Sequence, residues 1–289
     1  MRSWPIVAAL LLSTATAHSA PTQAGYRAGD VFEIRRDIES TEKNAEGSSL
    51  GSSTDRDTLM ERVVGTNQAG LELEYDLSKD VTADDRARQW QLPTRVLKPP
   101  HGPLQLLNRS ELEERVKAWL KSAGLTQVAC GHWYFTWNAF RIDCDPQSAI
   151  ETVEGFDLGP DGLSDGSPYL DSKALNPAPL KRTTTSLDGD VFFVEMAVAP
   201  DTIRRDQAEA DIVIAEITRK PLTLEAALKA RSTEDVSGTI AITFETNPAG
   251  HVRRQTKVTT LRFKGPDGQL KTRTVTETLE RRPVSRPST

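Results

Sequence analysis

The feature that most constrains the fold is a regular alternation of apolar and polar residues near the C-terminal end. Three stretches follow this pattern: residues 240–244, 252–263 and 270–279. A period of two is typical of strands with one buried face. The stretches between them, 246–250 and 265–268, are rich in Asn, Gly, Pro and Asp, which favour tight turns. Residues 240–279 therefore predict a three-stranded antiparallel meander.

The N-terminal third repeats this design. Apolar side chains recur at even spacing in residues 31–38 and again in 71–77, and residues 59–64 resemble a further strand. Residues 42–55 are dominated by Ser, Gly and charged side chains. That composition predicts a long loop between the first two strands.

Helical periodicity appears between these strands. Residues 110–123 place Leu112, Val116 and Leu120 on one stripe, and Ser110 with Glu113 forms a capping-box pattern at its start. Three further helices are expected: one starting at Asp145, one from about residue 201 to 217, and one over 224–230.

Strands and helices do not alternate regularly, which argues against a doubly wound parallel sheet. Asp188–Gly189 adds another hairpin, because Asp-Gly favours a two-residue turn. The expected fold is α+β, with a curved, mainly antiparallel β-sheet built from hairpins and meanders and three to four packed helices. A stretch rich in Gly, Pro, Asp and Ser, residues 159–180, is interpreted as a loop or hinge between a β-rich half (21–158) and a C-terminal half (181–289).

The first twenty residues have the three parts of a secretory signal peptide. Arg2 supplies the positive start, and residues 5–12 form an apolar run too short to span a bilayer as a helix. Cleavage is expected after Ala17 or, as a second choice, after Ala20, which Pro21 disfavours. No later stretch is long and apolar enough for a transmembrane segment, so a periplasmic or secreted location is predicted.

The chain has two cysteines, Cys130 and Cys144. In an oxidising compartment such a pair is most simply one disulfide, and closing a loop of about fifteen residues contributes roughly 3 kcal/mol in the chain-entropy description. A zinc site needs three or four ligands, and a redox pair needs the C-x-x-C spacing, neither of which is present. No metal or cofactor is expected.

Residues 162–166 match the G-x-S-x-G pattern that presents a nucleophilic serine in hydrolases. Ser164 would be that nucleophile, and His251, the one histidine that follows it, would be the base. The flanking residues resemble neither a buried strand nor a helix start. A secreted serine hydrolase is therefore kept as an alternative, and a non-enzymatic role is favoured.

The densest group of aromatic residues lies between the two cysteines. On a strand, Trp133, Phe135 and Trp137 would face the same side. Two interpretations stay open. The segment is a core stapled by the disulfide, or these three residues form the aromatic wall of a pocket for an apolar or sugar-like ligand.

Charge is unevenly distributed along a chain whose net charge is −5. Residues 251–289 carry ten Lys and Arg against three Asp and Glu. Nucleic acid is not expected as a partner of an exported protein, whereas an anionic envelope surface suits this basic end. The chain is similar in these respects to sheet-rich, single-disulfide proteins that Gram-negative bacteria export.

The sequence therefore favours an exported, non-enzymatic protein that binds an apolar small ligand or an envelope component. The other alternative is a structural protein-interaction module without a ligand pocket.

Overall fold

The computed structural model describes residues 25–100, 102–135, 139–264 and 268–284. The strands are β1 (Val31–Asn44), β2 (Ser49–Asn67), β3 (Gly70–Asp76), β4 (Thr94–Lys98), β5 (Gln105–Leu106), β6 (Trp133–Phe135), β7 (Ala139–Arg141), β8 (Pro168–Tyr169), β9 (Ala178–Pro179), β10 (Lys181–Ser186), β11 (Gly189–Ala197), β12 (Asp235–Thr246), β13 (Val252–Lys264) and β14 (Leu270–Pro283). The helices are α1 (Ala83–Arg88), α2 (Arg109–Ser122), α3 (Ser148–Glu154), α4 (Pro200–Ile217) and α5 (Leu224–Arg231), with a 3-10 turn, η1 (Gln127–Ala129).

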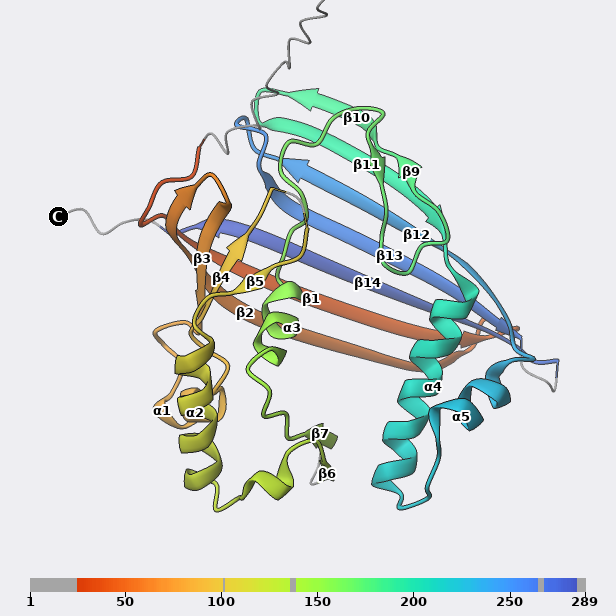
Figure 1. Cartoon of the computed structure of the whole chain (residues 1–289). Helices are drawn as coiled ribbons and strands as arrows, with labels where there is room; N and C mark the ends of the chain where they lie inside the picture. Colours follow the sequence, from red (N-terminus) through yellow and green to blue (C-terminus); the bar gives the residue numbers. More distant parts are fainter. Residues whose placement is uncertain (1–24, 101, 136–138, 265–267, 285–289) are drawn as a thin grey trace, which may run out of the picture.

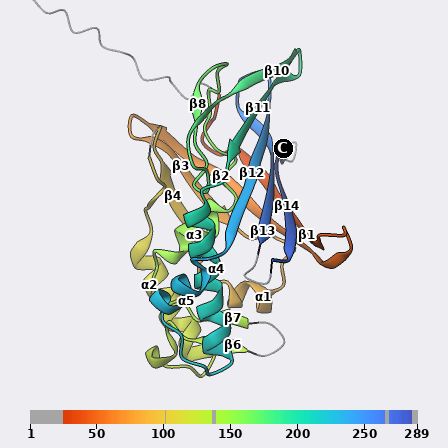
Figure 2. The ribbon, with the colours of Figure 1, turned by 90° about the vertical axis from the view of Figure 1, so that its right-hand side faces the viewer.

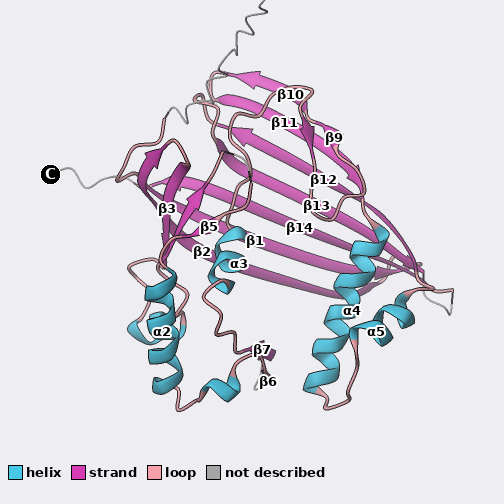
Figure 3. Cartoon of the chain, viewed as in Figure 1, coloured by secondary structure: helices cyan, strands magenta, loops and turns pink. Residues whose placement is uncertain are grey.

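Within the described residues, ten strands form one antiparallel sheet in the order β10-β11-β12-β13-β14-β1-β2-β3-β4-β5 (Figure 1). The pairs β6–β7 and β8–β9 form two small separate sheets. Figure 3 shows the helices gathered on one side of the large sheet, which curls forward through β3, β4 and β5. The predicted α+β fold with a curved antiparallel sheet is confirmed.

Pairing between β14 and β1 brings the N-terminal and C-terminal strands together inside the sheet. The predicted meander β12-β13-β14 is present, and β14 then pairs with β1 from Phe32↔Pro283 to Asn44↔Lys271. The two regions in which the sequence pattern is clearest are therefore neighbours in space.

The predicted loop over residues 42–55 is wrong. β1 extends to Asn44 and β2 starts at Ser49, so only a tight turn separates them. β1 lies between β2 and β14, and its polar end is therefore hydrogen-bonded on both sides. Backbone pairing within the sheet keeps this hydrophilic segment extended, which its composition did not indicate.

The predicted capping box at the start of α2 is also wrong. The helix begins at Arg109 with Asn108 as its N-cap residue. The Asn108 side chain accepts a hydrogen bond from the backbone N–H of Arg95 and donates one to the carbonyl of Pro93, so it fixes α2 against β4.

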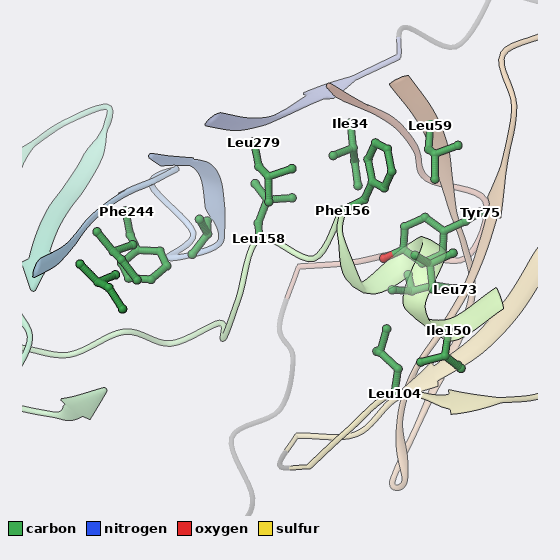
Figure 4. Packing of buried hydrophobic residues seen from close by; sticks show 14 of the residues in the cluster. Ile34, Leu59, Leu73, Tyr75, Leu104, Ile150, Phe156, Leu158, Phe244 and Leu279 are labelled. Atoms are coloured by element: carbon green, nitrogen blue, oxygen red, sulfur yellow. The ribbon is translucent and has the colours of Figure 1, made fainter. Parts of the chain in front are cut away.

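The main core lies on the inner face of the sheet (Figure 4). Side chains from β1, β2, β3 and from β11, β12, β14 belong to one buried cluster, so both predicted halves contribute to it. Phe156 and Leu158, which follow α3, pack into this cluster, and Leu180 is buried at the end of the same irregular stretch. The division of the chain into two halves around residues 159–180 stays a prediction.

A second group of elements lies at one end of the molecule. Figure 2 shows α2, α4, α5 and the β6–β7 hairpin together there, away from the ends of β10 and β11. α4 packs on α5 and reaches β6. The buried side of α4 consists of Ile203, Ala208 and Ala215, whereas Ile214 is exposed.

Candidate functional site

The two cysteines form the predicted disulfide. Cys130 and Cys144 are bonded, with their Cα atoms 5.5 Å apart. The bond closes the segment that carries β6 and β7, and a small cluster of Leu120, Ala129 and Ile142 packs beside it. A disulfide between the two cysteines fits an oxidising, extracytoplasmic compartment. The predicted signal peptide lies outside the described residues.

The structure describes part of the aromatic segment between the two cysteines. Trp133 is half-buried at the start of β6, and its backbone N–H donates a hydrogen bond to Glu216 of α4 over 3.3 Å. Trp133 pairs with Arg141, and Phe135 with Ala139, in the β6–β7 hairpin. Trp137 lies outside the described residues. A ligand-binding role for Trp133, Phe135 and Trp137 stays a prediction.

Ser164 and His251 have different partners in the described structure. The Ser164 hydroxyl lies 2.5 Å from that of Ser167, and His251 faces Asp161. Among the described residues no hydrogen bond joins Ser164 to His251. Residues 162–166 form an irregular turn that leads into the two-residue strand β8. A catalytic pairing of Ser164 with His251 stays a prediction.

The candidate site is an opening in the large sheet. β13 and β14 are paired as far as Arg254↔Glu280 and then diverge. Beyond that point Val252 pairs with β12, while the end of β14 pairs with Phe32 of β1. Figure 1 shows these strand ends separating. The space between them is a pocket of about 540 Å³.

The inner wall of this pocket is aromatic. Tyr26 lies between the diverging strands, with its ring centroid 4.2 Å from that of His251 and 6.1 Å from that of Phe32. The guanidinium of Arg281 lies 4.6 Å from the Tyr26 ring and 4.0 Å from the Phe32 ring. A guanidinium at this distance from two rings is held by cation–π attraction.

A buried carboxylate also neutralises the charge of Arg281. This arginine forms an ion pair with Glu61 and donates a hydrogen bond to the Tyr26 hydroxyl. The other oxygen of Glu61 accepts a hydrogen bond of 2.9 Å from the Tyr75 hydroxyl. The side chains of Arg281 and Glu61 are only 10% and 5% exposed, so the pair belongs to the interior. Burial raises the pKa of both tyrosines well above the usual range, so both hydroxyl groups stay protonated.

His251 forms the opposite side of the pocket floor. Its Nδ1 atom lies 3.4 Å from a carboxylate oxygen of Asp161, a distance too long for a normal hydrogen bond but short enough for electrostatic attraction. Burial opposes the ionisation of Asp161, but His251, Lys98 and Arg281 outweigh it and lower the pKa of that carboxyl group.

Gly25 covers the other nitrogen of the His251 ring. A Cβ atom at this position would lie 2.5 Å from Nε2, and the φ angle of Gly25 is +143°. Only glycine combines this backbone conformation with such a close approach. The chain before β1 therefore lies directly on the imidazole.

The outer rim of the pocket carries charge. Arg253 lies 3.3 Å from Glu245, and Arg282 lies 2.7 Å from Glu280. Arg254 also lines the pocket and forms no ion pair with any described residue. The pocket thus combines an aromatic floor with an arginine-rich rim.

Most of this site was missed in the sequence. His251 was singled out, but as a base for Ser164, and Tyr26, Phe32 and Arg281 lie at opposite ends of the chain. No sequence pattern indicated Arg281, because the face of β14 that carries it mixes charged and apolar side chains, among them Glu277 and Leu279.

The residues that the structure describes offer no metal site and no membrane-spanning helix. No three His, Cys, Asp or Glu side chains within them are arranged to hold a metal ion. None of the helices in the described ranges combines the length and the apolar composition needed to cross a membrane.

Comparison with known proteins finds little similarity. No family model and no curated protein sequence match the chain. A solved structure of lipid–protein interactions in lipovitellin aligns with 92% of this chain and 26% of its own, with a TM-score of 0.44 and 9% identity. This chain thus spans about a quarter of the lipovitellin chain. A hot dog fold protein of unknown function from Alicyclobacillus acidocaldarius aligns over 92% of this chain and 83% of its own, with a TM-score of 0.12 and 10% identity.

Proposed function

We propose that the protein is an exported, periplasmic or secreted binding protein, and that the pocket between β13 and β14 holds an apolar or amphiphilic small ligand. The observation that carries this proposal is an aromatic-floored pocket of about 540 Å³ in a split of the sheet. Ligand pockets are typically about 300–1,000 Å³ and mainly apolar, with a few polar groups that orient the ligand. The disulfide supports the proposed location.

The construction of the floor supports binding by a preformed surface. Tyr26 and Phe32 are fixed by the Arg281 guanidinium, which is itself fixed by Glu61. A ligand that packs against these rings need not order them first. Preorganisation of this kind lowers the entropic cost of association.

The composition of the pocket favours binding over catalysis. The described lining offers His251, Glu245 and Glu280 as possible general bases, and both carboxylates are already paired with arginines. No serine, cysteine, threonine or lysine is among those lining residues to act as a nucleophile. We therefore place the proposed ligand here and keep the Ser164–His251 hydrolase as the weaker candidate.

The test is ligand binding by wild-type mature protein and two phenylalanine variants. Isothermal titration calorimetry with lauric acid and with neutral 1-monolauroylglycerol, both below their critical micelle concentrations, measures affinity. Phe32→Ala removes one pocket ring, whereas Phe263→Ala removes an equally half-buried ring near the other end of β13. We expect binding of at least one amphiphile that is lost in Phe32→Ala and retained in Phe263→Ala.

Two results would contradict the proposal. If wild-type protein binds neither amphiphile, the pocket does not have the proposed function. Equal loss of binding in both variants would assign the effect to general destabilisation rather than to the pocket.

A further inference from the structure

Resting on the proposed pocket, we infer that its ligand carries an anionic head group, a carboxylate or a phosphate monoester, which binds to Arg254 at the rim. The apolar part of the ligand then lies against Tyr26 and Phe32. The ligand class is an anionic single-chain amphiphile.

The inference is supported by the charge balance around the pocket. Glu61 is paired with Arg281, Glu245 with Arg253, and Glu280 with Arg282. Each of these carboxylates thus has its own arginine. Arg254 is the additional cation, and it lies opposite Glu280 on β14 and opposite Glu245 on β12.

Arg254 is well placed to attract an anion from solvent. It is exposed and belongs to the last residue pair before β13 and β14 diverge. Arg282 and Arg254 both lower the pKa of Glu280, with Arg282 having the larger effect, so that carboxylate stays ionised and paired. Arginine binds carboxylates and phosphates through two parallel N–H groups, which suits a head group held at the rim.

The arrangement fixes the orientation of the ligand. The aromatic floor lies inside the split between the strands, and the unpaired cation lies at its outer edge. A chain bound inward with its anion outward would satisfy both regions. A free inorganic anion would use the rim alone and gain nothing from Tyr26 and Phe32.

The test compares three probes: lauric acid, neutral 1-monolauroylglycerol and inorganic phosphate. Each is titrated into wild type, Arg254→Gln and Arg262→Gln. Arg262 is the matched control, because it is an exposed arginine near the other end of the same strand. We expect lauric acid to bind wild type about tenfold more tightly than the neutral probe, and Arg254→Gln to lose about tenfold in lauric acid affinity. Arg262→Gln should bind like wild type.

The remaining outcomes separate this inference from the proposed function. Equal affinity for both amphiphiles, unchanged by Arg254→Gln, overturns the anionic head group and leaves the apolar pocket intact. Inorganic phosphate that binds as tightly as lauric acid also overturns the inference, because the site is then a simple anion site. Absence of binding by either amphiphile overturns the proposed function itself.

Discussion

Arg281 and Glu61 form an ion pair across β1, although they are 220 residues apart in the sequence. Arg281 lies at the end of β14 and Glu61 in β2, and both strands are neighbours of β1. The pair therefore joins the C-terminal meander to the N-terminal strands at the floor of the pocket.

Removing the cation from this pair should destabilise the protein strongly. Arg281→Met leaves the Glu61 carboxylate buried without a counter-ion, at an expected cost of about 3–5 kcal/mol in the free energy of unfolding. Urea denaturation at neutral pH measures this change. Adding Glu61→Gln should restore part of the loss, because the amide is neutral and still accepts the Tyr75 hydrogen bond. A double variant no more stable than Arg281→Met would contradict this account.

The Tyr75 hydroxyl should matter for stability in its own right. Tyr75→Phe removes the donor to Glu61 and leaves a buried carboxylate oxygen unpaired, at an expected cost of about 1–3 kcal/mol. Tyr169→Phe is the matched control, because no described residue is hydrogen-bonded to its hydroxyl and its ring packs on Phe244. The control should change the free energy of unfolding by less than about 0.5 kcal/mol. Similar losses in both variants would show that the effect does not come from the hydrogen bond between Tyr75 and Glu61.

The strands could be predicted where buried and exposed side chains alternate along the sequence. Residues 71–77 and 240–244 alternate because one face packs into the core, and both are strands. Residues 42–55 gave no such pattern, since polar side chains cover this part of the sheet. Their extended conformation depends on hydrogen bonds to β14 and between β1 and β2, which no local pattern records.

The pocket was not predictable for a related reason. Its residues come from before β1, from β1 itself, from the end of β12 and the turn that follows it, and from the ends of β13 and β14. Only the divergence of β13 from β14 brings Tyr26, His251 and Arg281 together. The disulfide, by contrast, followed from two cysteines and an inferred oxidising compartment, and it is confirmed.

The turn between β10 and β11 should depend on glycine. Gly189 has a φ angle of +124°, and a Cβ atom there would lie 2.0 Å from the backbone oxygen of Thr246. Gly189→Ala should therefore lower the free energy of unfolding by more than about 1 kcal/mol in urea denaturation. Gly51→Ala is the control, because Gly51 has open space around it in β2 and should be neutral or stabilising. Equal tolerance of both substitutions would rule out this steric requirement.

The disulfide should stabilise its own region rather than the large sheet. The cluster of Leu120, Ala129 and Ile142 beside it is separate from the main core. The double variant Cys130→Ala/Cys144→Ala should lose about 3 kcal/mol of protection against hydrogen exchange in α2 and η1. Exchange in β11 and β12 should be unchanged. Loss of protection in those strands as well would show that the bond supports the whole fold.

The buried contact between Asp161 and His251 predicts a pH dependence of stability. The pKa of Asp161 is below its ordinary value of 3.8, so the folded protein binds fewer protons at this site than the unfolded chain. The resulting stabilisation is present above about pH 4 and is lost as the pH falls through the folded-state pKa.

Asp161→Asn tests this dependence, because the amide cannot ionise. Urea denaturation should show wild type more stable than the variant at neutral pH, with the difference shrinking as the pH falls below the ordinary Asp value of 3.8. In a His251→Gln background the difference should be smaller at neutral pH, since one of the groups that lowers the Asp161 pKa is gone. A difference that stays constant down to pH of about 2 would mean that the Asp161 charge does not stabilise the fold.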